Sequence, residues 1–280
     1  MAKLLRTTGL SRGWTPNLLS NRIAMIGWLL SLVVLSMYAS SSEDMSYLEA
    51  ASSSIVVFLG WAVGRELDPD RPPVATIAMV GTLGAVFLEV PSAWTVGAAL
   101  LALRIVTGST GRWIGAYDIG FGAVIGYGAG AAIWSWPIAL VAFVAVLVLP
   151  GLGSQRWWLA IPMVPAFVAA WYLGDLAPIM IATDQALIAV CVGVGCALSM
   201  LAVTADSPTD RSQGRLSAGR IRWARGAAAL FAISAVLLGG LEPFWEIAAV
   251  TAALGAAALV AVVAALQTVA RLRSEGAATD

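Results

Sequence analysis

The sequence predicts an all-α protein, a polytopic membrane bundle of about ten transmembrane helices with both termini in the cytoplasm. Three observations lead to this prediction. Of 280 residues, 60% are apolar and only 11% are charged, whereas about 25% are charged in an ordinary soluble domain. The apolar residues form runs close to the ~20 residues that a membrane-spanning helix needs. Finally, the basic residues follow every second run, as the positive-inside bias requires.

The apolar runs place the expected helices in order along the chain. Residues 1–21 form a polar cytosolic lead-in rather than a cleaved signal, because the first apolar run begins only after Arg22. A single transmembrane domain covers 22–270, and 271–280 form a cytosolic tail. Some runs are short for a span, so eight or nine spans remain open. The expected helices are 22–40, 47–64, 73–88, 92–107, 114–133, 137–151, 157–174, 185–204, 226–241 and 245–269.

The charges assign one orientation to this bundle. Basic residues lie before the first helix and after the second, fourth, sixth, eighth and tenth. The opposite loops contain acidic residues and no Lys or Arg. Because Lys and Arg favour the cytoplasmic side, we expect both termini inside and the chain in the cell (inner) membrane. The basic residues are Lys3, Arg6, Arg12, Arg22, Arg65, Arg71, Arg104, Arg112, Arg156, Arg211, Arg215, Arg220, Arg222, Arg225, Arg271 and Arg273.

Composition also excludes several kinds of chemistry. The formal net charge is zero, so no global field favours nucleic acid as a partner; membrane lipids are the expected partners. The chain contains no histidine, which removes His-based catalysis and His-ligated metals. Cys191 and Cys196 lie five residues apart in one apolar run, on different faces of a helix. We therefore expect them to be packing residues rather than a disulfide.

Small residues form a stripe in the expected helix 114–133. Gly122, Gly126 and Gly130 are spaced four residues apart, which lets another helix approach closely. The stripe predicts tight packing inside the bundle, with a homodimer interface as the alternative.

Two stretches separated by 140 residues resemble each other. Both end an apolar run with the pattern A-V-x-x-[DE]-x-x-x-D-R, at 62–71 and 202–211. The pattern suggests that helices 1–4 and 7–10 are a parallel internal repeat.

The repeat places two acidic clusters on the cytoplasmic face. Glu66, Asp68 and Asp70 alternate along a turn stiffened by proline, and Asp206 and Asp210 form the second cluster. Carboxylates so spaced can hold Mg²⁺, whose remaining coordination positions go to water or substrate phosphate. The alternative is two solvated loops in which acids and prolines mark helix ends.

A third segment runs from Arg104 to Arg112 and has Gly and hydroxyl residues between the two arginines. Such a segment can bind a substrate phosphate through backbone N–H groups and guanidinium groups. The alternative is a turn with topology-setting arginines, in which Asp118 pairs with Arg104. We assign a topology-setting role to the arginines of the loop 205–225 as well.

Three functions fit these features. Size and helix number resemble the drug/metabolite transporter class, which implies a small-molecule or lipid transporter, and the lack of charge at depth argues against ion coupling. The pairs Glu66–Asp70 and Asp206–Asp210 resemble the paired aspartate motifs of UbiA prenyltransferases. That resemblance implies a Mg²⁺-dependent enzyme acting on a prenyl or lipid diphosphate at the cytoplasmic face. A non-catalytic membrane subunit is the third.

Overall fold

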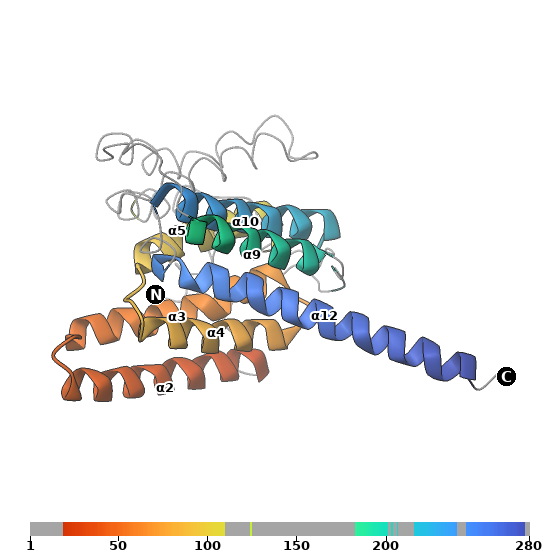
Figure 1. Cartoon of the computed structure of the whole chain (residues 1–280). Helices are drawn as coiled ribbons and strands as arrows, with labels where there is room; N and C mark the ends of the chain where they lie inside the picture. The colour runs from red at the N-terminus through yellow and green to blue at the C-terminus, as the bar shows by residue number, and fades with distance from the viewer. Residues whose placement is uncertain are drawn as a thin grey trace.

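The computed structural model describes residues 19–109, 124, 183–200, 203, 206, 216–239 and 245–277. These residues form helices, with no strand among them. Figure 1 shows the helices stacked roughly side by side in layers. The helices are α2 (Leu19–Ser41), α3 (Tyr47–Leu67), α4 (Pro72–Val86), α5 (Ala93–Thr107), α9 (Thr183–Met200), α10 (Ala218–Gly239) and α12 (Ala248–Ala277).

Seven of the ten expected helices fall in the described part of the chain, and a helix is present at each of these places. The ends of α2 to α5 lie within three residues of the expected ends. The expected start of the helix at 226 is wrong, because α10 begins at Ala218. An apolar run locates the membrane-embedded part of a helix, but arginine is itself a good helix former, so the helix continues into the arginine-rich segment. The remaining three expected helices, at 114–133, 137–151 and 157–174, lie outside the described residues except for Val124.

Local sequence signals set several helix ends. Ser46 and Glu49 form a reciprocal capping box at the start of α3, which satisfies backbone N–H groups that the helix leaves free. Pro72 occupies the first position of α4, where a missing N–H costs nothing. Gly108 ends α5 in the left-handed conformation, with φ 61°, which is unstrained only for glycine.

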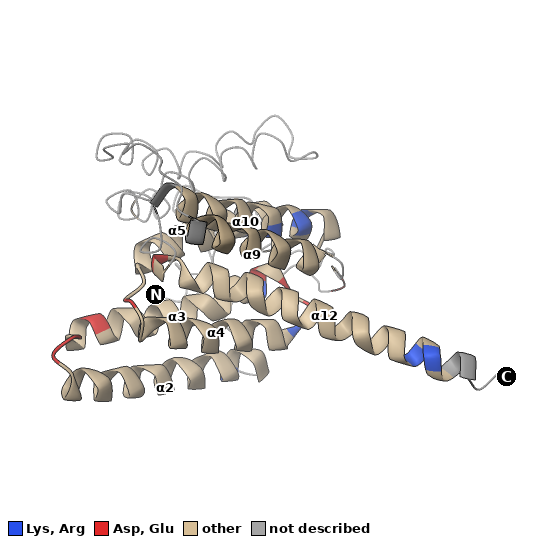
Figure 2. Ribbon diagram, viewed as in Figure 1, with Lys and Arg blue, Asp and Glu red and all other residues tan. Residues whose placement is uncertain are grey.

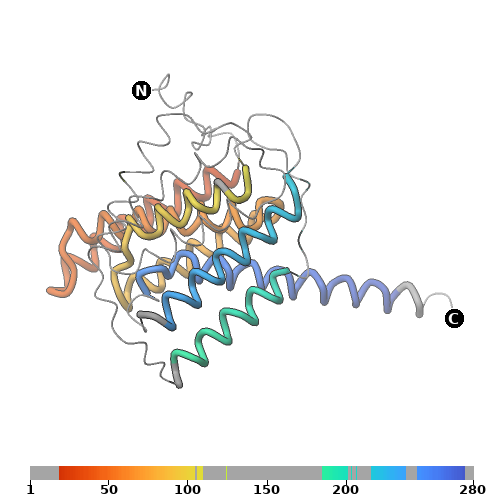
Figure 3. Tube along the Cα trace, turned by 90° about the horizontal axis from the view of Figure 1, so that it is seen from above, coloured from red at the N-terminus to blue at the C-terminus, as the bar shows by residue number. Residues whose placement is uncertain are grey.

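Helix α12 lies at the centre of the packing and contacts α3, α4 and α9. Figure 3 shows it running between α4 and α9. Its buried face is mostly alanine, so neighbouring backbones come close. The same is true between α3 and α4, where a Cβ atom on Gly64 would lie 2.8 Å from Ala75 Cα. Small residues at these interfaces are typical of membrane helix packing.

Three helices are long and apolar enough to cross a membrane: Leu19–Ser41, Tyr47–Leu67 and Ala248–Ser274. The apolar helices Pro72–Val86, Ala93–Arg104 and Gln185–Met200 are shorter. Many large apolar side chains of α2 are exposed, among them Ile26, Leu30 and Val33. These features are consistent with a membrane protein, because lipid would cover such side chains.

Charged residues in the described helices lie near helix ends (Figure 2). At one end of the bundle α3, α5 and α9 finish and α4 and α10 begin. We call this end the polar end. Arg65 donates a hydrogen bond to Ser20 at 3.2 Å, so α2 starts at the same end. The last part of α12 projects past this end, clear of the other helices (Figure 1).

Candidate functional site

The acidic residues at the end of α3 and in the turn before α4 connect three other segments at the polar end. They are Glu66, Asp68 and Asp70, and the first two are almost fully buried. The sequence analysis placed all three in a candidate Mg²⁺ site. In the structure each carboxylate contacts a different part of the protein.

Glu66 joins α3 to α5. Its Oε1 atom accepts a hydrogen bond from Arg104 Nε at 3.1 Å. Its Oε2 atom accepts one from the Thr107 hydroxyl, also at 3.1 Å. Both carboxylate oxygens of a buried group are therefore satisfied, as a buried charge requires. Glu66 is thus a carboxylate partner of Arg104. The partner proposed from the sequence, Asp118, lies outside the described residues.

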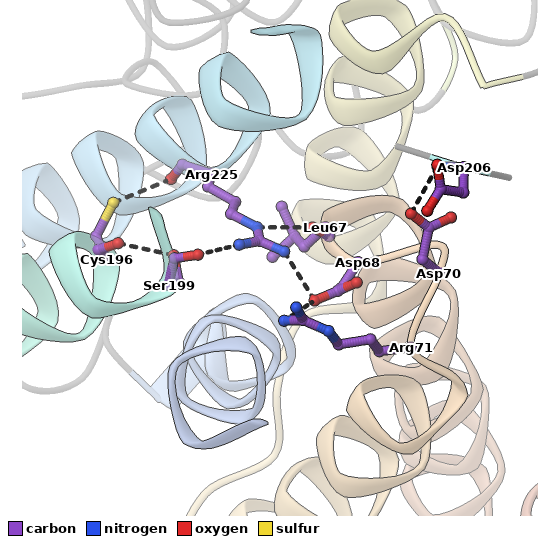
Figure 4. A network of polar contacts seen from close by, with 8 residues as sticks. All are labelled: Leu67, Asp68, Asp70, Arg71, Cys196, Ser199, Asp206 and Arg225. Carbon is purple, nitrogen blue, oxygen red and sulfur yellow. Dashed lines mark hydrogen bonds and ion pairs between the residues drawn. The ribbon is translucent and has the colours of Figure 1, made fainter. Parts of the chain in front are cut away.

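Asp68 joins the turn to α10. Its Oδ2 atom accepts a hydrogen bond from Arg225 Nη2 at 2.8 Å and lies 3.6 Å from Arg71 Nη1. The Arg225 side chain is fully buried. It also donates from Nε to the Leu67 carbonyl oxygen at 2.8 Å and from Nη1 to the Ser199 carbonyl oxygen. Figure 4 shows Arg225 reaching across from α10 between the ends of α3 and α9.

Asp70 joins the turn to the segment between α9 and α10. Its Oδ2 atom accepts a hydrogen bond from the Asp206 backbone N–H at 2.9 Å (Figure 4). The two acidic clusters of the sequence analysis therefore meet at Asp70 and Asp206. No group of three or more Cys, Asp and Glu side chains arranged to hold a metal ion is found within the described ranges. The Mg²⁺ site stays a prediction.

Burial governs the electrostatics of Asp68. Loss of water raises the pKa of its carboxyl above the ordinary value, and the positive charges of Arg225 and Arg71 counteract that shift. The ion pair is what keeps a carboxylate charged in this environment. One oxygen, Oδ1, is buried and has no hydrogen-bond partner in the described part of the protein.

The turn after α5 contains the predicted phosphate-binding segment. Gly108 donates its N–H to the Arg104 carbonyl oxygen at 2.9 Å and closes the helix. The guanidinium of Arg220 covers this glycine, and its Nε donates to the Val106 carbonyl oxygen at 3.0 Å. A cation at a helix C-terminus complements the helix dipole. Arg104 itself donates to Glu66, and the phosphate-binding role of this segment stays a prediction.

Six residues with assigned roles lie outside the described residues. They comprise two members of the candidate phosphate site, one candidate Mg²⁺ ligand and the glycine stripe: Arg112, Asp118, Asp210, Gly122, Gly126 and Gly130. Their roles stay predictions.

The expected position of Arg225 in the loop 205–225 is wrong. The residue lies in α10, two turns after its start, and is buried. A helical signal for this position exists in the sequence. Arg225 follows Ile221 by four residues and precedes Ala228, Ala229 and Ala232, all buried. This i, i+4, i+7 stripe is the buried face of α10, and it becomes visible only once the helix is started at Ala218.

No protein-family model, curated protein or solved structure matches this chain. Functional inference therefore depends on the contacts at the polar end.

Those contacts join five helices through charged side chains. α3, α4, α5, α9 and α10 all meet there, and the only fully buried guanidinium among the described residues is at the centre. Such a network can hold the bundle end closed. A guanidinium so placed can also bind an oxyanion.

Proposed function

We propose that this protein is a membrane carrier for small molecules or lipids that works without ion coupling, and that the Asp68–Arg225 pair closes its cytoplasmic end. The carrying observation is the burial of Arg225 and its pairing with Asp68 across two helices. Buried charges in a membrane bundle pair with each other and mark the path of a substrate or ion. The polar end is the cytoplasmic end in this proposal, because the basic residues gather there.

Energetics support a functional role for this pair. Replacing a buried ion pair by apolar side chains of similar volume is often neutral or stabilising, by about 1–4 kcal/mol. Stability alone therefore does not account for the Asp68–Arg225 pair in a bundle whose described interior is mostly apolar. A functional role, in which the pair opens and closes the end of the bundle, does account for it.

The distribution of charge supports transport without ion coupling. The charged residues of the described helices lie within two turns of a helix end or beyond the bundle on α12. The middle of each described helix carries none. Carriers driven by protons or sodium often keep carboxylates at depth, so a facilitator or exchanger is the better fit.

Uptake into proteoliposomes tests this proposal. The full-length protein is reconstituted and exposed to a panel of radiolabelled metabolites and short-chain lipids, with empty liposomes as the control. We expect at least one compound to equilibrate, at a rate unchanged when ionophores collapse proton and sodium gradients. Folded protein that moves nothing contradicts the carrier, and uptake that stops with the gradients contradicts uncoupled transport.

One observation favours a second function, a Mg²⁺-dependent enzyme acting on a prenyl or lipid diphosphate. Asp70 and Asp206 lie together although the two acidic segments are 136 residues apart, as two diphosphate-binding motifs would. The test is Mg²⁺-dependent binding of a prenyl diphosphate to the purified protein and to the double variant Asp70→Asn, Asp210→Asn. Binding that the double variant loses supports the enzyme; no binding to the parent rejects it. A chain that fails both tests is best assigned as a non-catalytic subunit.

A further inference from the structure

We propose that the cargo carries an oxyanion, a carboxylate or a phosphate, which displaces Asp68 and binds between Arg225 and Arg71. This inference rests on the proposed carrier function and adds the chemical class of its substrate. Asp68 then acts as a built-in competitor that occupies the guanidinium groups while no substrate is present. The contacts in Figure 4 carry the argument.

The first step is the poor geometry of the existing pair. Asp68 offers a single oxygen, Oδ2, to both arginines, at 2.8 Å from Arg225 Nη2 and 3.6 Å from Arg71 Nη1. The other oxygen is buried and makes no hydrogen bond with any described residue. Arginine and an oxyanion interact most strongly through two parallel hydrogen bonds. A mobile anion, free to orient, can therefore contact these arginines better than Asp68 does.

The second step is that Arg225 stays in place when Asp68 leaves. Its Nε and Nη1 atoms donate to the carbonyl oxygens of Leu67 and Ser199, which belong to the ends of two helices. These bonds do not depend on the carboxylate. Without Asp68 the guanidinium is still buried, charged and oriented, and a buried charge without a counter-ion is strongly unfavourable. The site then favours any anion that fits.

The third step is access. Arg71 lies at the start of α4 with 19% of its side chain exposed, so an anion can contact Arg71 before it reaches buried Arg225. Asp70 also lies close enough to act on Asp68, and its negative charge opposes an incoming anion although its Oδ2 atom accepts a hydrogen bond from the Asp206 N–H. The Asp68 Oδ2 atom itself faces two guanidinium groups, those of Arg225 and Arg71, and an anion that replaces this oxygen contacts both.

Anion binding to the Asp68→Asn variant tests the inference. The purified full-length protein is titrated with inorganic phosphate and with succinate, at ionic strength held constant with chloride, and the thermal unfolding midpoint is followed. Removing the competing carboxylate raises the fraction of binding-competent protein, so we expect the apparent Kd to fall by about tenfold in the variant. Asp68→Asn should also be less stable than the parent without the anion and recover when it is added. Equal responses of parent and variant overturn the inference.

A second variant keeps the test decisive if Asp68→Asn does not fold. Arg71→Gln leaves the Asp68–Arg225 bond intact and should weaken anion binding several-fold. Arg271→Gln, which removes an exposed positive charge from α12, is the matched control and should bind as the parent does. Anion affinity unchanged in Arg71→Gln overturns the inference.

Two further measurements distinguish a lipid headgroup from a soluble anion as the ligand, and the carrier proposal from this inference. Stabilisation by phosphatidylglycerol vesicles over phosphatidylcholine vesicles, without an effect of phosphate or succinate, assigns the oxyanion to a lipid headgroup. Stabilisation by the soluble anions assigns it to a soluble substrate. Anion binding with no uptake of any anion contradicts the carrier alone, whereas uptake of neutral compounds with no anion binding contradicts this inference alone.

Discussion

At the scale of single residues, we expect the buried Asp68–Arg225 pair to be highly sensitive to substitution. Arg225→Gln leaves Asp68 buried with only the more distant Arg71 as a counter-charge. Removing one member of a buried pair costs about 3–5 kcal/mol. We therefore expect a large fall in the thermal unfolding midpoint of Arg225→Gln. The double variant Asp68→Asn, Arg225→Gln should recover a substantial part of that loss, since neither partner is then charged.

Arg222 provides the control for this cycle. It lies on the same helix, three residues before Arg225, and is exposed. Arg222→Gln should change the midpoint little, because exposed charges contribute little to stability. If the double variant is as unstable as the sum of the single variants, the two residues are not coupled, and the role given to this pair is wrong.

The residues at this site were only partly predictable from sequence. Glu66, Asp68, Asp70 and Arg104 stood out because charge is rare in this chain and these charges lie beside apolar runs. Their partners did not stand out. Asp68 and Arg225 are 157 residues apart, and no pattern within a short stretch of sequence connects them. Arg225 was further hidden among neighbouring arginines whose common role is to set topology. A buried and an exposed arginine in such a cluster differ only in their position around the helix.

At the scale of helices, the packing of α3 against α4 depends on Gly64. A Cβ atom there would lie 2.8 Å from Ala75 Cα, which is backbone and cannot rotate away. Gly64→Leu should therefore separate the helices and lower the unfolding midpoint clearly. Gly84→Ala is the matched control, because nothing lies within 4 Å of the added atom. It should be neutral or stabilising by up to about 1 kcal/mol, as alanine favours a helix over glycine. A Gly64→Leu variant as stable as the parent would show that α3 and α4 are not closely packed.

Helix positions were more predictable than helix ends. Hydropathy placed α2, α3, α4 and α5 well, because their apolar runs are bounded by turn residues such as Pro72 and Gly108. It placed the start of α10 eight residues too late, and α12 continues to Ala277, past the expected end at 269. In both helices the extra turns carry arginine. Arginine opposes insertion into lipid but not the helical conformation, so hydropathy reports where a membrane could lie and misses the polar turns beyond it.

At the scale of the whole molecule, the described chain begins and ends at the same end of the bundle. Ser20 near the start of α2 is bonded to Arg65 near the end of α3. α12 follows α10 in the chain. It begins at the end of the bundle opposite the polar end and runs back past the polar end (Figures 1 and 3). The two ends of the described chain thus lie on one side of the bundle, and the expected count of ten spans stays a prediction.

Cysteine accessibility on intact cells tests the side on which these ends lie. In a background with Cys191→Ala and Cys196→Ala, one new cysteine replaces Glu43, in the turn between α2 and α3, and another replaces Ser274, near the end of α12. Both positions are exposed, and they lie beyond opposite ends of the bundle. From the basic residues we predict that the polar end lies in the cytoplasm. A membrane-impermeant maleimide should therefore label Glu43→Cys on intact cells and Ser274→Cys only after permeabilisation. The reverse pattern would put the Asp68–Arg225 pair at the outer surface, and the closure proposed for the cytoplasmic end would then belong to the other side of the membrane.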